Sequence, residues 1–270
     1  MKSKTKGYLL IVSVIAIILL IILLEFMQKT KSIATNADTS VSNSKIGWGI
    51  KRNDNHEQPD VGKENKRLLE ENNGICLGNN EKKIIYLTFD EGYEAGYTSK
   101  ILEKLKENEV KATFFITAHY LNTQEELVKQ MIDEGHIVGN HTVNHKSMPD
   151  LTDEKIKTEV MNLHQAIYEK FGYEMKYIRP PMGEFSQRTL KITTSLGYKN
   201  VMWSFAYEDW NENKQPDENK SKEKVINNLH NGEIMLLHGN SKTNTNILDS
   251  VIKEAKNMGY EFKSLDEFEK

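Results

Sequence analysis

Several short apolar stretches of this chain end in side chains that can bind a metal or transfer a proton. The residues that share this placement are Asp90, Glu91, His141, His145, Arg179 and His238. Carboxylates and imidazoles gathered in one place are the usual ligands of divalent metals and the usual acids and bases of hydrolysis. A buried charge is costly unless it is paired, so these groups are expected to be partners of one another.

His141 and His145 stand four residues apart in HTVNH. On a helical turn this spacing puts both imidazoles on one face. Two imidazoles and one carboxylate can hold a divalent metal with positions left open, and Glu91 is the carboxylate expected to complete the set. Such a metal acts as a Lewis acid and lowers the pKa of a bound water. Zn²⁺ is the expected ion, and Mn²⁺, Co²⁺ or Mg²⁺ would also fit.

The two neighbouring acids can do different work, because adjacent side chains on a strand point opposite ways. If Glu91 reaches the metal, Asp90 is left to take a proton from water as general base. Arg179 is the expected counter-charge that keeps Asp90 ionised. The alternative is that Asp90 and Arg179 form only a structural salt bridge.

His238 ends the apolar run of MLLH, where its imidazole can protonate a leaving amine. The two prolines of RPPMG stiffen the loop after Arg179, and the N–H group of Met182 or Gly183 can bind an oxyanion. The remaining residues expected to line a substrate pocket are Asp209, Trp210 and His119.

The elements that must position these groups alternate between strand and helix. Strand-like runs cover 84–89, 112–116, 136–139, 176–179, 199–204, 233–238 and 261–264. Helical patterns cover 98–108, 123–134, 153–171, 187–196, 222–231 and 246–258. Seven strands with covering helices predict an α/β fold in which a parallel sheet closes as a (β/α) barrel. Chemistry in such barrels lies just after the strands, where the candidate residues stand.

Capping residues mark several helix ends. Thr123, with Glu126 three residues later, is expected to begin one helix, and Thr152 is expected to begin the long helix that follows. Glycines stand just beyond five helical patterns, where a left-handed cap is favoured. They are Gly135, Gly172, Gly197, Gly232 and Gly259.

Composition excludes some classes of function. The net charge of the 270 residues is −3 and the signs are interspersed, so no basic stripe for nucleic acid is present. The single cysteine, Cys76, rules out an internal disulfide.

The N-terminus carries lysines before an uncharged apolar run at 8–24, long enough to cross a bilayer. The expected divisions are a membrane anchor or uncleaved signal (1–28), a flexible linker (29–46), an arm that packs on the barrel (47–83) and the catalytic domain (84–270). We expect a single-pass protein of the cell membrane with its catalytic domain outside the cytoplasm. Secretion after signal cleavage is the alternative.

Five motifs in this order resemble those of the polysaccharide deacetylases, also called the NodB-homology or carbohydrate esterase family four superfamily. They are TFDEG, HTVNH, RPPMG, the segment ending in Asp209-Trp210, and MLLH. The resemblance implies a distorted (β/α) barrel and metal-dependent removal of an N-acetyl group from a sugar. By position, Asp90 would be the base, Arg179 its partner, His141 and His145 metal ligands, and His238 the acid.

Further segments resemble the delta-lactam-biosynthetic de-N-acetylases of endospore formers. They are TFDEGYEAG, FFITAHYL, GNHTVNH, RPPMGEFS, WSFAYEDW and, in the arm, Trp48-Gly49 and NHEQP. This resemblance implies action on N-acetylmuramic acid in peptidoglycan already stripped of peptide, leading to muramic-δ-lactam in spore cortex. Deacetylation of N-acetylglucosamine and a non-catalytic glycan-binding barrel are the alternatives.

Two positions depart from the superfamily. The first motif usually has Asp at the position of Glu91, and the fourth usually has, at the position of Ala206, an Asp that supports the acid histidine. Asp209 is the candidate substitute for that support.

Overall fold

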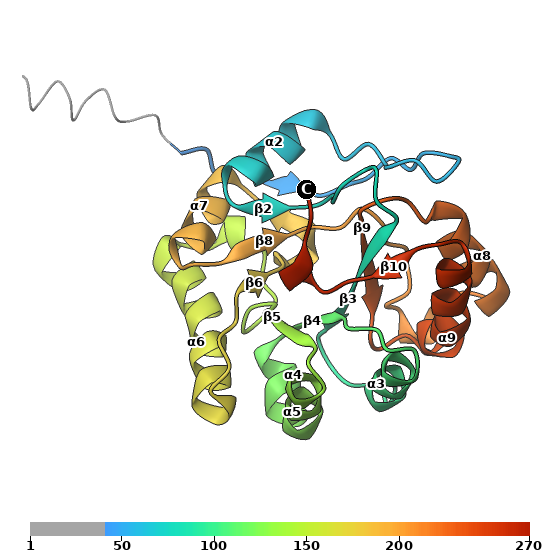
Figure 1. Cartoon of the computed structure of the whole chain (residues 1–270). Coiled ribbons are helices and arrows are strands. Elements are labelled where there is room, and N and C mark those ends of the chain that lie inside the picture. Colours follow the sequence, from blue (N-terminus) through green and yellow to red (C-terminus); the bar gives the residue numbers. More distant parts are fainter. Residues whose placement is uncertain (1–40) are drawn as a thin grey trace, which may run out of the picture. The chain divides into compact units, whose positions relative to one another are not determined.

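The computed structural model describes residues 41–270, and eight of their strands form one curled parallel sheet covered by helices (Figure 1). The order is β10-β3-β4-β5-β6-β8-β2, and β9 also pairs with β3. These strands are β2 (Gly74–Ile75), β3 (Ile84–Glu91), β4 (Thr113–Ile116), β5 (Ile137–Asn140), β6 (Tyr177–Ile178), β8 (Lys199–Val201), β9 (Glu233–His238) and β10 (Glu261–Phe262). The predicted α/β class and parallel sheet are confirmed.

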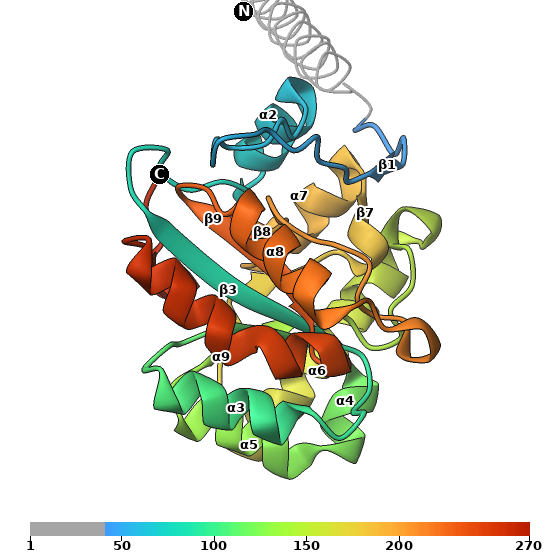
Figure 2. The same ribbon diagram turned by 90° about the vertical axis from the view of Figure 1, so that its right-hand side faces the viewer.

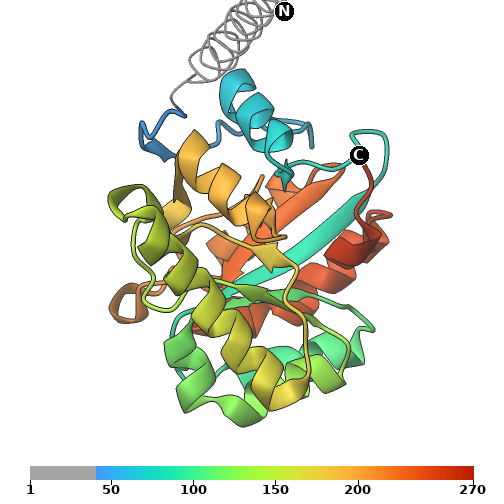
Figure 3. The ribbon, with the colours of Figure 1, turned by 90° about the vertical axis from the view of Figure 1, so that its left-hand side faces the viewer.

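The helices lie outside the curl. They are α2 (Lys63–Glu71), α3 (Thr98–Glu107), α4 (Ala118–Thr123), α5 (Glu125–Asp133), α6 (Asp153–Phe171), α7 (Gln187–Ser195), α8 (Glu218–Asn228) and α9 (Lys242–Asn257). Short 3-10 turns are η1 (Met148–Asp150), η2 (Pro181–Gly183), η3 (Glu212–Lys214) and η4 (Leu265–Glu267). Figure 2 shows α9 along the long strand β3 with α3 beside α9, and Figure 3, from the opposite side, shows α6 beside α7.

The segment after β8 reaches back to β9. The Ser204 N–H donates to the Ile234 carbonyl at 2.9 Å, and the Leu236 N–H donates to the Phe205 carbonyl at 2.8 Å. Phe205 also forms a parallel bridge with Met235. These bonds bring one end of the curled sheet to the strand beside β3, as in (β/α) barrels.

β3 is the central strand, and all eight of its residues are buried. Successive side chains point to opposite faces. One face packs in the core shared with the helices, through Ile85, Leu87 and Phe89. On the other face, Ile84 and Tyr86 pack inside the curl. The same alternation directs Asp90 inward and Glu91 toward the helices.

The helix predicted at 123–134 is α5, which begins two residues later, and α4 before it was not predicted. Thr123 is the last residue of α4, so the prediction that it caps a helix is wrong. Its hydroxyl donates to the His119 carbonyl at 2.9 Å, and Gln124 stands at the start of α5 without a side-chain capping bond. Thr152 does cap α6, where its side chain accepts from the Lys155 N–H. Gly172 ends that helix with φ 63°, the left-handed conformation expected there.

The segment before β3 packs against the edge of the sheet. β2 pairs with β8, and the short strand β1 (Ile46–Gly47) pairs with β7 (Glu184–Phe185). Trp48 donates from its indole nitrogen to the Trp203 carbonyl at 2.9 Å. Cys76 is buried in the same apolar cluster as Trp48 and Phe185. This segment therefore supports the loop that follows β6.

The predicted anchor at 1–28 and most of the linker at 29–46 lie outside the described residues. Within 41–270, no helix is both long and apolar enough to cross a membrane.

Candidate active site

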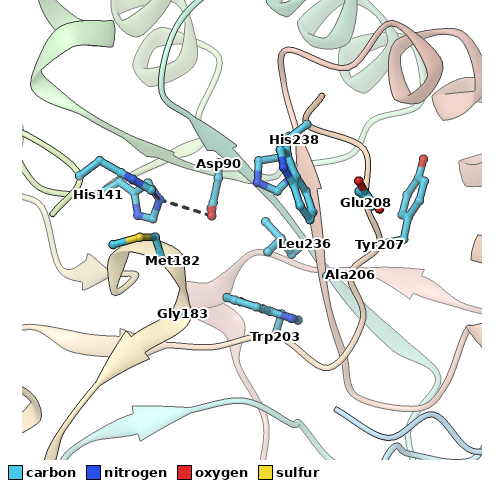
Figure 4. Close-up of a pocket in the computed structure, with 12 residues that line it drawn as sticks. Asp90, His141, Met182, Gly183, Trp203, Ala206, Tyr207, Glu208, Leu236 and His238 are labelled. Atoms are coloured by element: carbon cyan, nitrogen blue, oxygen red, sulfur yellow. Dashed lines mark hydrogen bonds and ion pairs between the residues drawn. The ribbon is translucent and has the colours of Figure 1, made fainter. Parts of the chain in front are cut away.

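Asp90 lies at the centre of a cleft at the carboxyl ends of the strands. Its Oδ1 accepts from Arg179 Nη1 at 2.7 Å, and its Oδ2 lies 3.5 Å from His141 Nε2. Figure 4 shows the carboxylate between His141 on one side and His238 on the other. Burial would raise the pKa of the Asp90 carboxyl, but the charge of Arg179, with smaller effects from the histidines, holds it below its ordinary value. Asp90 is therefore an ionised carboxylate with one free oxygen.

Arg179 is wholly buried beneath this carboxylate. Its Nη2 donates to Thr88 Oγ1 at 2.9 Å, and its Nε donates to the Val201 carbonyl at 3.2 Å. The guanidinium also lies over the ring of Phe115, 4.3 Å from the centroid. These contacts fix the fork of the guanidinium, so Asp90 is oriented as well as charged.

The cleft has an apolar floor beside the carboxylate. A cavity of about 540 Å³ opens there. Its lining includes Asp90, His141, His145, Met182, Trp203, Trp210, Leu236 and His238. This size and mixture are typical of a site that takes a small organic group through a few polar contacts.

His141 and His145 do come together, but not on a helical turn as the i, i+4 spacing predicted. Their Nε2 atoms are 3.1 Å apart. The segment is a loop in which Thr142 has φ 67° and His145 has φ 53°, both left-handed. The Thr142 hydroxyl accepts from the His145 N–H at 3.1 Å and steadies the turn.

A buried acid on α6 holds this loop. The Glu159 carboxylate accepts from the Asn144 backbone N–H at 2.7 Å and from Asn144 Nδ2 at 2.6 Å. The Glu159 carbonyl accepts from the Val143 N–H at 3.0 Å. Sequence reasoning missed Glu159, because an acid within a long helix normally faces solvent.

The two histidines suit a divalent metal. His141 Nδ1 faces the Arg179 carbonyl at 2.8 Å, so that nitrogen carries the proton and Nε2 presents a lone pair. Two nitrogens on a tetrahedral zinc at 2.0–2.1 Å would be roughly 3.3 Å apart, close to the observed spacing. Burial lowers the pKa of His141 to about 4, which keeps the ring neutral. No complete set of three such ligands is formed within residues 41–270.

Glu91 does not join the histidines, which corrects the prediction that it is a metal ligand. Its carboxylate points to the helix side, where Oε1 accepts from Thr98 Oγ1 at 3.3 Å. Gly239 packs so closely that a Cβ there would meet Oε1 at 1.8 Å. Burial, followed by the charge of Glu94, raises the pKa of Glu91 well above its ordinary value. The alternation along β3 explains this, because Asp90 and Glu91 must face opposite sides.

His238 has a different partner. Its Nδ1 lies 2.7 Å from Asp209 Oδ1, and its backbone N–H donates to Asp209 Oδ2 at 2.9 Å. Asn244 Nδ2 donates to the same carboxylate, and the Tyr207 hydroxyl donates to Asn244 Oδ1. Burial would lower the pKa of His238, but Asp209 raises it above its ordinary value. His238 is therefore suited to donate a proton into the cleft from Nε2.

Asp209 was expected to line the substrate pocket, and this expectation is wrong. It is only 1% exposed, and its carboxylate is occupied by His238 and Asn244. Its contact with His238 is the one expected of the candidate substitute for a carboxylate that Ala206 lacks.

The loop after β6 carries two N–H groups that were predicted to bind an oxyanion, and they differ in whether they already have an acceptor. The Gly183 N–H donates to the Pro180 carbonyl at 3.1 Å, so it is not free for an oxyanion. Within the described part of the chain, the Met182 N–H has no such acceptor. Met182 has φ 58° and is 53% exposed beside the cleft. Met182 is thus the better of the two predicted oxyanion donors.

Trp210 and His119 both line the cleft. Trp210 is 49% exposed, and its ring centroid is 5.3 Å from that of His238. His119, on α4, borders a second cavity that also contains Asp90. Of the predicted site residues, Glu91 and Asp209 point away from this cleft, and Arg179 is buried beneath it.

A family model described as Polysaccharide deacetylase matches residues 77–201. The peptidoglycan-N-acetylmuramic acid deacetylase PdaA of Bacillus subtilis is 44% identical over 234 residues, covering 86% of this chain and 89% of that protein. A peptidoglycan-N-acetylglucosamine deacetylase of Bacillus cereus is 33% identical over 195 residues, covering 70% of this chain and 89% of that protein. The solved structure of Bacillus subtilis PdaA, a family 4 carbohydrate esterase, matches with a TM-score of 0.82 at 43% identity, covering 84% of this chain and 98% of that one.

Proposed function

This chain belongs to the polysaccharide deacetylase family, whose enzymes hydrolyse N-acetyl groups, and we propose that it deacetylates N-acetylmuramic acid residues of peptidoglycan. The single observation that carries the proposal is the Asp90 carboxylate, oriented by Arg179 between an imidazole pair and a supported His238. The relative with the muramic substrate is 44% identical, against 33% for the glucosamine enzyme, and this difference favours the muramic sugar.

Asp90 is the general base in this proposal. Its free Oδ2 takes a proton from the attacking water, while Arg179 holds Oδ1 and keeps the group ionised. Water oxygen then forms a bond to the acetyl carbon, and the carbonyl oxygen gains negative charge. The Met182 N–H is the donor proposed for that oxygen.

His238 is the proposed general acid. Its Nε2 gives a proton to the sugar nitrogen as the C–N bond breaks, which yields acetate and a free amine. Asp209 on Nδ1 favours the protonated ring needed for this step. Trp210 and Leu236 provide an apolar wall that suits the acetyl methyl group.

The proposed metal would be held by His141 and His145 through Nε2. When bound, it supplies Lewis-acid polarisation of the amide and a more acidic water. Zn²⁺ is the proposed ion, because imidazole ligands and open positions suit it, and Mn²⁺, Co²⁺ or Mg²⁺ is compatible with the same donors.

The product of this reaction has a free amine on the same sugar as the lactyl carboxyl group. Closure of these two groups gives muramic-δ-lactam, so a lactam-forming step in spore cortex is the proposed consumer. That closure requires a free lactyl carboxyl, which fits strands already stripped of peptide.

Mass analysis of glycan strands, with and without peptide stems, tests the function. We expect a free amine on muramic acid residues of the peptide-free strands. A free amine only on glucosamine residues would replace this function with the second candidate, N-acetylglucosamine deacetylation, which the Bacillus cereus relative favours.

We also propose that the apolar run at 8–24 tethers the enzyme to the cell membrane, with residues 84–270 outside the cytoplasm. Membrane fractionation and protease accessibility in intact cells test this placement. Recovery of a shortened chain in the medium would show signal cleavage and secretion instead.

A further inference from the structure

The cleft extends beyond the cavity in which Trp210 and Leu236 form the apolar wall proposed for the acetyl methyl group. A second hollow of about 660 Å³ shares Asp90, Trp210 and His238 with the first and adds Tyr93 and Asn240. A third hollow of about 350 Å³ continues past Tyr93 and Asn240 without any catalytic group. The cleft is therefore longer than one N-acetyl sugar requires, and Tyr93 and Asn240 stand at the junction.

Exposed apolar side chains gather along this cleft. Within the described residues, the large apolar side chains that are largely exposed are Val41, Tyr93, Tyr168, Met182 and Trp210. Three of them, Tyr93, Met182 and Trp210, line the cleft. Such gathering usually marks a binding surface. Aromatic rings of this kind present flat apolar faces with a polar tip, which suits the C–H face of a sugar ring.

Asn240 holds the two aromatic residues in place. Its Nδ2 donates to the Tyr93 hydroxyl at 2.9 Å and to the Trp210 carbonyl at 3.0 Å. The Asn240 residue is only 8% exposed, so this amide is spent on the connection rather than on solvent. The Tyr93 ring is thus oriented before any ligand arrives, which lowers the entropic cost of binding.

The backbone on both sides of Tyr93 is also fixed. The Gly92 carbonyl accepts from Thr117 Oγ1 at 3.0 Å. The Glu94 carboxylate accepts from the Tyr97 N–H at 2.6 Å and from the Thr98 N–H at 3.2 Å. Tyr93 therefore projects from an anchored turn, although 44% of it is exposed.

We propose that Tyr93, oriented by Asn240, is the platform for the sugar ring next to the one that is deacetylated. The ligand of this second position is a neighbouring pyranose of the same glycan strand, so the enzyme recognises at least two connected sugars. This inference rests on the proposed function and adds to it the residue that holds the neighbouring sugar of the strand.

The test compares Tyr93→Ala with Tyr93→Phe on peptide-free glycan strands and on the single amino sugar. Loss of one aromatic contact should raise KM for strands roughly three- to tenfold in Tyr93→Ala. The single sugar should show a much smaller change. Tyr93→Phe keeps the ring but loses the bond to Asn240, so its KM should lie between those of Tyr93→Ala and the unchanged protein.

Tyr168→Ala is the matched control, because Tyr168 is 47% exposed on α6 and lines none of these hollows. It should leave KM for strands unchanged. The inference is overturned if Tyr93→Ala leaves KM for strands unchanged, or if it raises KM for strands and for the single sugar by the same factor.

Calorimetric binding of short glycan fragments separates the two proposals. If no glycan releases acetate, the proposed function fails, and weaker fragment binding by Tyr93→Ala would still uphold the second position. Equal binding by the variant and the unchanged protein would refute that position even if acetate is released.

Discussion

Two imidazole sites face Asp90 from opposite sides, and they differ in what lies behind the ring. Behind His141, Nδ1 meets the Arg179 backbone carbonyl at 2.8 Å, and burial lowers the pKa of the ring to about 4. Behind His238, Nδ1 meets the Asp209 carboxylate at 2.7 Å; burial would lower its pKa, but the carboxylate raises it. The same side chain thus becomes a neutral electron-pair donor on one side and a proton donor on the other.

The difference lies in the charge of one acceptor. A carbonyl fixes the tautomer without favouring the charged ring, so Nε2 keeps a lone pair for a metal. A carboxylate stabilises the imidazolium, so Nε2 keeps a proton for a leaving group. Asp90 lies between the two rings, and in the proposed reaction it takes a proton from water beside both of them.

Replacing Asp90 breaks both sides at once and should have the largest effect. In Asp90→Asn the shape and the contact with Arg179 can remain, but no base is left to take the proton from water. We expect acetate release to fall by about 10³–10⁴-fold. A variant that still releases acetate at the original rate would remove Asp90 from its proposed role.

Replacing the two histidines separately should reveal their different work. His238→Ala should lose about 10²–10³-fold in acetate release while keeping its divalent metal. His141→Ala should lose the metal itself, measured as metal content after dialysis. Equal metal content in both variants would erase the distinction between the two sides.

The hydrogen bonds from Asn144 to the Glu159 carboxylate allow the proposed metal site to be tested without changing a metal ligand. Glu159→Ala removes both acceptors of the Asn144 N–H groups, so the loop that carries His141 and His145 should loosen. We expect metal affinity to fall by about 10–100-fold, as for other groups that orient ligands. Competition with a chelator measures it.

The conservative variant Glu159→Gln gives the control for this contact. Its amide oxygen can accept the Asn144 backbone N–H, and its amide N–H can donate to Asn144 Oδ1 when that side-chain amide turns over. Metal affinity should therefore stay close to that of the unchanged protein. If Glu159→Gln binds metal as weakly as Glu159→Ala, the hydrogen bonds to Asn144 are not what positions the loop.

Asp209→Asn should have the smallest effect on activity of these variants, and the effect should appear as a shift in pH dependence. Asp209 raises the pKa of His238, so its removal lowers that pKa. His238 can act as an acid only when it is protonated, so the fall in activity with rising pH should begin at a lower pH in the variant. Above neutral pH the variant should have roughly tenfold less activity. Metal content should stay the same. If the basic limb of the pH–rate profile does not move, Asp209 does not act by raising the pKa of His238.

The sequence predicted much of this arrangement because strand and helix periods are local. The strand ranges predicted for β3 and β9 agree closely with the structure, and so does the whole of α6. Parallel strands end at one rim, so Asp90, Arg179 and His238 could be grouped without knowing any distance.

What the sequence did not show depends on contacts between distant segments. The loop around His141 uses left-handed residues other than glycine, which no residue type announces. Glu159 acts from the middle of a helix. Asp209 was named as a candidate support for the acid histidine, but its contact with His238 depends on a long loop that folds back. The position of Glu91 was predictable, since the alternation that turns Asp90 inward turns Glu91 outward.

The decisive measurement for metal-dependent deacetylation is acetate release from peptide-free glycan strands by metal-stripped and by metal-reloaded protein. We expect no acetate from the stripped protein and acetate in proportion to the divalent metal restored. Full release from the stripped protein would contradict the role of His141 and His145. No release under any divalent metal, with glycan still bound, would instead show a glycan-binding barrel without catalysis.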